Sequence, residues 1–142
     1  MTLDRSAIER SVPHAGEMCL LDAVQQWDAS DIVCIAAAPG AAHPLARGGV
    51  VPAVAAAEYA AQAAAIHGAL LDGCTAPTGM LAKLINVQFH ADCIPADRGP
   101  LTVHARLRGR GASGCLYDFE VDCAHHSIAG GRLMVAFAAT PA

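Results

Sequence analysis

Large rings and charged side chains are both scarce in this sequence. Aromatic residues make up 4% of its 142 residues and charged residues 15%, against 54% hydrophobic residues. Alanine and aliphatic side chains must therefore fill the core. With a net charge of −4, the sequence lacks the basic stripe that nucleic-acid-binding proteins need. The densest basic group, Arg106, Arg108 and Arg110, alternates along a predicted strand, which indicates a solvated face.

Targeting and membrane-spanning segments are also missing. The N-terminal segment carries acids and no apolar core, so it resembles neither a secretory signal nor an anchor, and we expect a cytoplasmic protein. The most apolar stretch, residues 48–71, contains Glu58, Gln62 and His67. Because ionisable groups are expensive in lipid, this stretch is expected to be a buried helix and not a membrane span.

Metal-site spacing is absent too. The six cysteines include no CxxC pair, and in a reducing compartment they are expected to pack as thiols in the core. Residues 122–126 read Asp-Cys-Ala-His-His. Their spacing matches no regular zinc site, and adjacent histidines point apart on a strand. We therefore expect no disulfides and no bound metal.

The alanine-rich run is the strongest structural signal. Alanine is the best helix former, so residues 52–71 are predicted to form one long helix. Pro52 suits its first turn, and Gly73 suits its end. This helix is apolar on nearly every side, which is typical of a helix surrounded by other structure.

Alternating hydrophobic and polar residues predict strands on both sides of this helix. Residues 28–31 have hairpin chemistry, residues 39–49 form a loop, and residues 109–114 form a turn. A Gly130-Gly131 pair is expected to produce a bulge. The predicted strands span residues 18–27, 32–38, 80–90, 101–108, 115–123 and 128–138. One or two helical turns are expected at residues 4–10.

The order of these elements predicts one α+β domain over residues 1–142. Two strands precede the long helix and four follow it. A helix that is apolar all round needs a curled antiparallel sheet to cover one side and further structure to cover the rest. A second copy of the chain is the economical supplier of that cover.

Glu58 is the only acid in the predicted helix, and Gln62 lies one turn later on the same face. A carboxylate there must be paired, open to a cleft, or protonated. Desolvation keeps a carboxyl protonated more easily, which suits a general acid near neutral pH. A structural glutamate, bonded to the backbone or to a partner chain, is the alternative.

Histidines supply the other candidates for proton transfer. His43 lies in the loop before the helix, where a merely solvated histidine is the alternative. His67 lies on the helix face opposite Glu58 and is expected to be a satisfied core histidine or to line another pocket. His14 could form a hydrogen bond near the start of a strand.

Two segments in order resemble the FabA/FabZ-type 3-hydroxyacyl-[acyl-carrier-protein] dehydratases. VPHAGEMCLLDAV, at residues 12–24, resembles the family's PHRxPMLLVDRV segment. RGGVVPAVAAAEYAAQA, at residues 47–63, resembles its GxPVMPGVLxxExMAQA segment. Pro52, Glu58, Ala61 and Gln62 keep the family's spacing. The most similar subgroup is that of the aryl polyene pathways.

This resemblance implies a hotdog fold, an antiparallel sheet wrapped around a long central helix. It implies a dimer, a higher oligomer or a hetero-oligomer with a homologue, with each active site between two chains. His43 would remove the proton next to the thioester, and Glu58 would protonate the leaving hydroxyl. The N–H groups at the helix start, around Ala53, would polarise the thioester carbonyl.

The expected substrate is a 3-hydroxyacyl thioester carried on an acyl carrier protein, and the expected product is the trans-2-enoyl thioester. Gln62, Ala53, Gly49 and His14 are the expected substrate-binding residues. No metal or other cofactor is expected.

The sequence departs from the family pattern around its histidine. The family reads GHFPG where this chain reads AAHPLARGG, and His43 lies one residue further from Glu58. Two alternatives therefore stay open. A hotdog thioesterase would use the helix carboxylate to activate water, and a catalytically silent subunit would pair with an active homologue.

Overall fold

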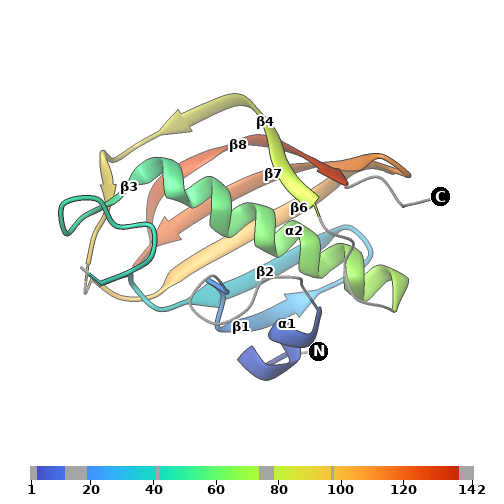
Figure 1. The fold of residues 1–142 in the computed structure, drawn as a ribbon, viewed down its shortest axis with the longest axis horizontal. Helices are drawn as coiled ribbons and strands as arrows, with labels where there is room; N and C mark the ends of the chain where they lie inside the picture. Colours follow the sequence, from blue (N-terminus) through green and yellow to red (C-terminus); the bar gives the residue numbers. More distant parts are fainter. Residues whose placement is uncertain (1–2, 12–18, 41, 74–78, 97, 138–142) are drawn as a thin grey trace.

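A curved six-stranded antiparallel sheet wraps around one long helix in the computed structural model (Figure 1). The structure describes residues 3–11, 19–40, 42–73, 79–96 and 98–137. The strand order is β1-β2-β6-β7-β8-β4. These strands are β1 (Ala23–Trp27), β2 (Asp31–Ala36), β4 (Gly79–Phe89), β6 (Leu101–Gly111), β7 (Gly114–Cys123) and β8 (His126–Phe137). The predicted hotdog architecture is confirmed.

Helix α2 (Ala56–Asp72) is the predicted alanine-rich helix. It is preceded by a 3-10 turn, η2 (Ala53–Ala55). Gly73 ends it in the left-handed region at φ +69°, and its N–H donates to the carbonyl of Ala69, as expected of a glycine C-cap. Ala56, Ala60 and Ala63 are fully buried, which confirms a helix covered by other structure.

A short two-stranded sheet, missed by the sequence analysis, holds the start of the helix. It pairs β3 (Val51–Pro52) with β5 (Cys93–Ile94). The N–H of Ala53 donates to the carbonyl of Asp92 at 3.0 Å. Strands of two residues carry too little alternation to be recognised from the sequence.

The first strand is shorter than predicted because its early residues bond elsewhere. The N–H of Leu20 donates to Oε1 of Gln62 on α2 at 2.8 Å. The carbonyl of Cys19 accepts from Arg5 of α1 (Arg5–Ser11) at 2.7 Å. Residues 19–22 therefore tie two helices together instead of extending the sheet.

The β6–β7 hairpin corrects the prediction for Arg110. The predicted turn narrows to residues 112–113, and β6 continues to Gly111. The register shifts between Leu107 and Gly109, so Arg108 is an extra residue that reverses the alternation beyond it. The Arg110 side chain turns toward α2 and is 22% exposed, against 49% for Arg108 on the solvated face. The expected solvated role of Arg110 was wrong.

The predicted bulge lies in the strand opposite Gly131. The β4–β8 register is irregular between Ile85 and Gln88 of β4. A Cβ on Gly131 would lie 2.7 Å from the Cα of Val87. Glycine is therefore required for this close approach of the two backbones.

His67 is a core histidine with a hydrogen-bond partner at each ring nitrogen, which was one of the two roles predicted for it. Its side chain is fully buried. Nδ1 lies 2.6 Å from the hydroxyl of Tyr117, and Nε2 lies 2.7 Å from the carbonyl oxygen of Asp28. Because a carbonyl only accepts, Nε2 carries the proton and Nδ1 accepts from Tyr117. No described helix is long and apolar enough to cross a membrane.

Candidate active site

Glu58 opens onto a cavity of about 300 Å³ between α2 and strands β4, β7 and β8. This cavity, called the groove below, is lined along the helix by Glu58, Ala61, Gln62, Ala65 and Gly68. Their spacing of three and four residues places them along one side of the helix. The volume lies at the lower end of the range for small-molecule sites.

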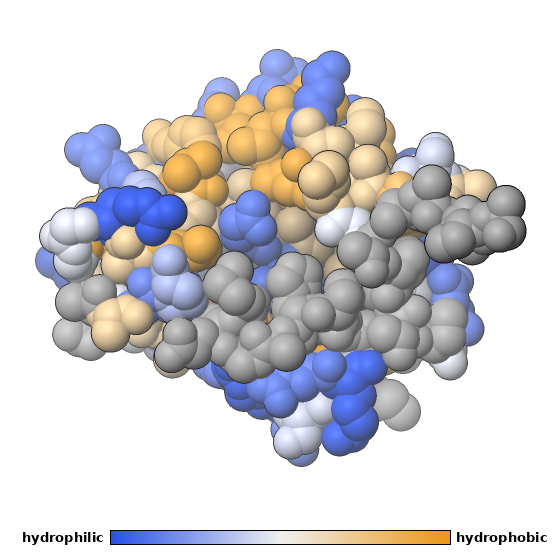
Figure 2. All heavy atoms as spheres, in the orientation of Figure 1, coloured by the Kyte–Doolittle hydropathy of each residue, from blue (hydrophilic) through white to orange (hydrophobic). Residues whose placement is uncertain are grey.

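The groove lies beside the most hydrophobic part of the visible surface. Hydrophobic residues gather over β4 in the upper part of Figure 2. Met80 of β4 lines the groove and is 69% exposed. Strand β4 ends the strand order, so its outer edge has no neighbour among the described strands. A long apolar chain entering the groove would meet a surface that suits it.

Gln62 reaches from the same side of the helix into the core. It is 2% exposed, and its Oε1 accepts from the N–H of Leu20. The sequence assigned it to substrate binding. The structure places it on the groove wall with one oxygen already committed to the backbone, so it also fixes the segment before β1.

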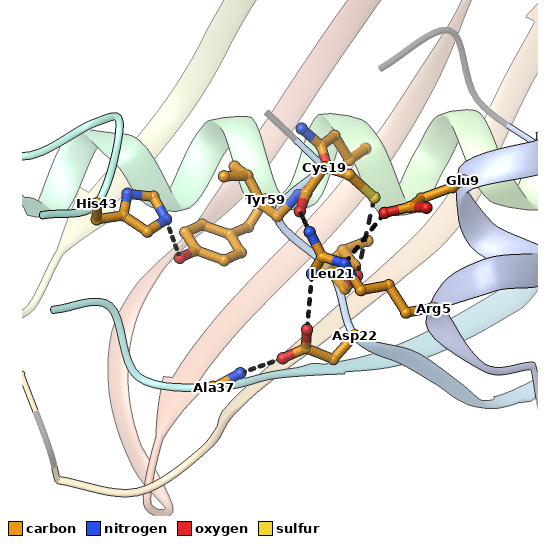
Figure 3. Close-up of polar contacts among 10 residues, drawn as sticks. Arg5, Glu9, Cys19, Leu21, Asp22, Ala37, His43 and Tyr59 are labelled. Atoms are coloured by element: carbon orange, nitrogen blue, oxygen red, sulfur yellow. Dashed lines mark hydrogen bonds and ion pairs between the residues drawn. The ribbon is translucent and has the colours of Figure 1, made fainter. Parts of the chain in front are cut away.

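The His43 side chain contacts Tyr59, which is the residue after Glu58 in α2 (Figure 3). The two rings stack with centroids 6.1 Å apart and an interplanar angle of 19°. Nε2 lies 3.1 Å from the Tyr59 hydroxyl, and Nδ1 accepts from the N–H of Leu45 at 3.1 Å. A neutral ring that accepts at Nδ1 carries its proton on Nε2, so Nε2 donates to Tyr59.

Burial sets the protonation of both partners. Desolvation lowers the pKa of His43 below its ordinary 6.5, because it disfavours the charged imidazolium. Desolvation also raises the pKa of the 1%-exposed Tyr59 to about 12. Both rings are therefore neutral near pH 7.

His43 and Glu58 do not share the groove within one chain. Tyr59 follows Glu58 by one residue, which turns it about 100° around the helix. His43 packs against Tyr59 and is not among the groove-lining residues. Among the described residues, no histidine lines the groove beside Glu58.

The remaining predicted residues lie before or at the helix start. Gly48 and Gly49 have φ values of +60° and +80° and form a tight turn in which Arg47 and Val50 bond to each other. Such a turn favours glycine at both positions. Because the Ala53 N–H already donates to Asp92, a substrate carbonyl would need another N–H of that first turn. His14 lies outside the described residues.

Sequence reasoning missed a polar cluster next to His43. Asp22 accepts from Arg5 at 2.8 Å and from the N–H of Ala37 at 2.7 Å (Figure 3). It thereby links α1 to the end of β2, from which the His43 loop departs. Nothing in the spacing of these residues could have indicated the contact. Among the described residues, no group of three or more His, Cys, Asp or Glu side chains could hold a metal ion.

The fold and the groove fit one family of hotdog proteins. Residues 6–141 match the family model described as ApeP-like, ApeP dehydratase. The chain therefore belongs to the ApeP-like dehydratase family, which agrees with the resemblance found in the sequence and with its aryl polyene subgroup. No curated protein sequence matches it.

Solved structures confirm the hotdog fold. The dehydratase heterocomplex ApeI:P from Xenorhabdus doucetiae aligns with a TM-score of 0.82 at 20% identity, over 94% of this chain and 91% of that chain. AziG from S. sahachiroi aligns at 0.58 and 18% identity, over 82% and 90%. A mutant thioesterase, PA1618 from Pseudomonas aeruginosa, aligns at 0.57 and 14% identity, over 80% and 78%.

Proposed function

We propose that this chain takes part in dehydrating a 3-hydroxyacyl thioester, carried on an acyl carrier protein, to the trans-2-enoyl thioester. The observation that carries the proposal is Glu58, half-buried at the wall of the groove in a chain of the ApeP-like dehydratase family. A carboxyl at the wall of a cavity is well placed to protonate a leaving group away from bulk water. The cytoplasmic location stays a prediction.

The proposed reaction needs one base and one acid. His43 removes a proton from the carbon next to the thioester carbonyl, and Glu58 gives a proton to the 3-hydroxyl, which leaves as water. The carbon–oxygen bond breaks as the carbon–carbon double bond forms, and the thioester itself is retained. The elimination involves no net oxidation or reduction, and the proposal assigns no step to a metal or other cofactor.

The two groups would come from different subunits. In the described chain the proton of the His43 ring is on Nε2 and Tyr59 accepts it. For Nε2 to act as a base, Tyr59 must release it and the ring must change tautomer, which ends the bond from Leu45. We infer that the active form is an oligomer in which a second hotdog chain faces Glu58.

A second candidate function follows because both ring nitrogens of His43 already have hydrogen-bond partners. The chain could supply Glu58 and the groove to a homologous subunit that supplies its own histidine. The fold neighbour described as a dehydratase heterocomplex is consistent with such an arrangement. In this case the His43–Tyr59 contact is structural.

The test compares the purified chain alone with the chain mixed with a homologous hotdog dehydratase. Each sample is incubated with 3-hydroxyacyl and enoyl thioesters on an acyl carrier protein, and gain or loss of water is followed by mass spectrometry. Turnover by the chain alone supports a self-sufficient dehydratase. Turnover by the mixture above that of the homologue alone, with none by this chain alone, supports the partner-subunit role. Release of the thiol without loss of water would contradict both and indicate a thioesterase.

A further inference from the structure

The end of the groove distant from Glu58 is occupied by an ion pair. Arg110 of β6 donates to both carboxylate oxygens of Asp72, the last residue of α2, at 2.8 and 2.5 Å. Its guanidinium lies over Gly68, where a Cβ would be 3.2 Å from Nη2. Arg110 and Gly68 both line the groove. Gly68 is the lining residue of α2 furthest along the helix from Glu58, so the guanidinium forms part of the groove wall at that end.

This guanidinium is not free to bind an anion, but it can limit how far a ligand extends along the groove. Both of its terminal nitrogens are committed to Asp72 in a two-pronged pair, so its charge is already matched. The pair raises the pKa of Arg110 and lowers the pKa of Asp72, so both groups stay charged at neutral pH. Pushing an apolar chain end between the two paired charges would separate them, which costs free energy without a compensating contact.

Stability gives little reason for the pair to be there. The Asp72 side chain is 45% exposed, and exposed ion pairs contribute about 0–1 kcal/mol. The backbone nonetheless makes room for it: Arg110 lies opposite the buried Cys115 beyond the β6 bulge, and the glycine at position 68 leaves space for the guanidinium over the helix.

We propose that the Arg110–Asp72 pair closes the groove and sets the longest acyl chain that this protein accepts. This inference rests on the proposed function, because it assigns the groove to the acyl chain of the thioester. Glu58 and Gly68 are ten residues apart on α2, which corresponds to about 15 Å along the helix. Each carbon–carbon bond of about 1.5 Å advances an extended chain by about 1.25 Å, so about twelve bonds, or roughly thirteen carbons, span that distance.

Binding of non-reacting thioether analogues of acyl thioesters, from six to eighteen carbons, tests the proposal without any need for turnover. The dissociation constant is measured by calorimetry on the full chain. In the unchanged protein, affinity should rise by about fourfold per added methylene that is buried, and then stop rising at a defined length. In Arg110→Ala, that break should move to longer chains by at least about two carbons, because the vacated guanidinium spans several bonds of about 1.3–1.5 Å.

Two further variants keep the result interpretable. Asp72→Ala removes the partner that holds the guanidinium over Gly68, so Arg110 can swing out to solvent and the break should also move to longer chains. Arg108→Ala removes an ion pair with Asp118 on the outer face of the same strand, and it should leave the break unchanged. Circular dichroism checks that each variant is folded.

The outcomes separate this inference from the proposed function. A break that stays fixed in both folded variants, or one that moves equally in Arg108→Ala, overturns the end wall. Affinity that does not depend on chain length in the unchanged protein also overturns it. A break that moves as expected, in a protein that dehydrates nothing alone or with a homologue, supports the end wall while the proposed reaction fails.

Discussion

The two sides of helix α2 are built from the same small residues but differ in what covers them. On one side, Tyr59 and His67 are buried, and each bonds to a named partner, His43 or Tyr117. On the other side, Glu58 and Ala65 open onto the groove. The buried side holds its polar groups in place, whereas the groove side leaves a carboxyl and a cavity open to a ligand. Alanine is buried on both sides of the helix, so substitutions are needed to tell the two sides apart.

The largest effect is expected at the proposed proton-transfer groups. Glu58→Gln keeps the shape of the groove wall but cannot deliver a proton, so dehydration should fall by about 10²–10⁴-fold. His43→Ala should cause a loss of similar size. Initial rates on a 3-hydroxyacyl thioester measure both, with circular dichroism as the check on folding. Full activity in His43→Ala would reject His43 as the base and leave the role of Glu58 open.

On the buried side, the expected loss is in stability. His67→Leu leaves the Tyr117 hydroxyl and the Asp28 carbonyl without their partner, and should lower the free energy of unfolding by roughly 2–4 kcal/mol. His104→Leu is the matched control, because His104 is 44% exposed and bonds to Asp31. It should cost less than about 1 kcal/mol. Denaturant unfolding measures both, and equal losses would contradict the contrast.

Adding the same side chain to each side of the helix sharpens the comparison. Ala60 is fully buried, so Ala60→Leu should overpack the core and destabilise the fold by about 1–3 kcal/mol. Ala65 lines the groove, so Ala65→Leu should cost less stability but shorten the longest acyl analogue that binds. Thermal unfolding measures the change in stability, and binding of the acyl analogues of increasing length measures the change in the limit. A shorter limit in Ala60→Leu instead would place the acyl chain on the wrong side.

The smallest expected effect is a pH dependence at His43. Its pKa is lowered by burial, so the neutral ring persists below pH 6.5, and the acid limb of kcat/KM should lie below that value. The same shift adds stability that is present above the unfolded pKa of 6.5 and is lost as pH falls through the lower folded pKa. Proton NMR titration measures it, with His43→Gln to assign the resonance. A folded pKa above 6.5 would contradict this account.

Much of the fold could be predicted because its signals are periodic. The alanine run predicted the end of α2 to within one residue and its start to within four, because a 3-10 turn comes first. Strict alternation predicted β6 and β7 over most of their length. Glu58 could be singled out because an acid in an apolar helix is conspicuous. These signals are local in the sequence and need no knowledge of what lies across the sheet.

The rest depended on contacts between distant segments. Two hydrogen bonds, between Gln62 and Leu20 and between His43 and Tyr59, join groups whose positions in the sequence give no sign that they meet. Arg110 was placed on the wrong face because alternation cannot reveal a bulge. The two-residue strands β3 and β5 were missed because they form only where two segments about forty residues apart meet.

The register beyond the β6 bulge has a consequence for how this protein could change. Arg110 pairs with the buried Cys115 of β7, so deleting the extra residue would make the strand regular and still leave Arg110 on the groove side. Under the proposed end wall, a lineage of these proteins could accept longer chains by one substitution at Arg110 or Asp72, whereas loss of the bulge codon would leave the limit where it is.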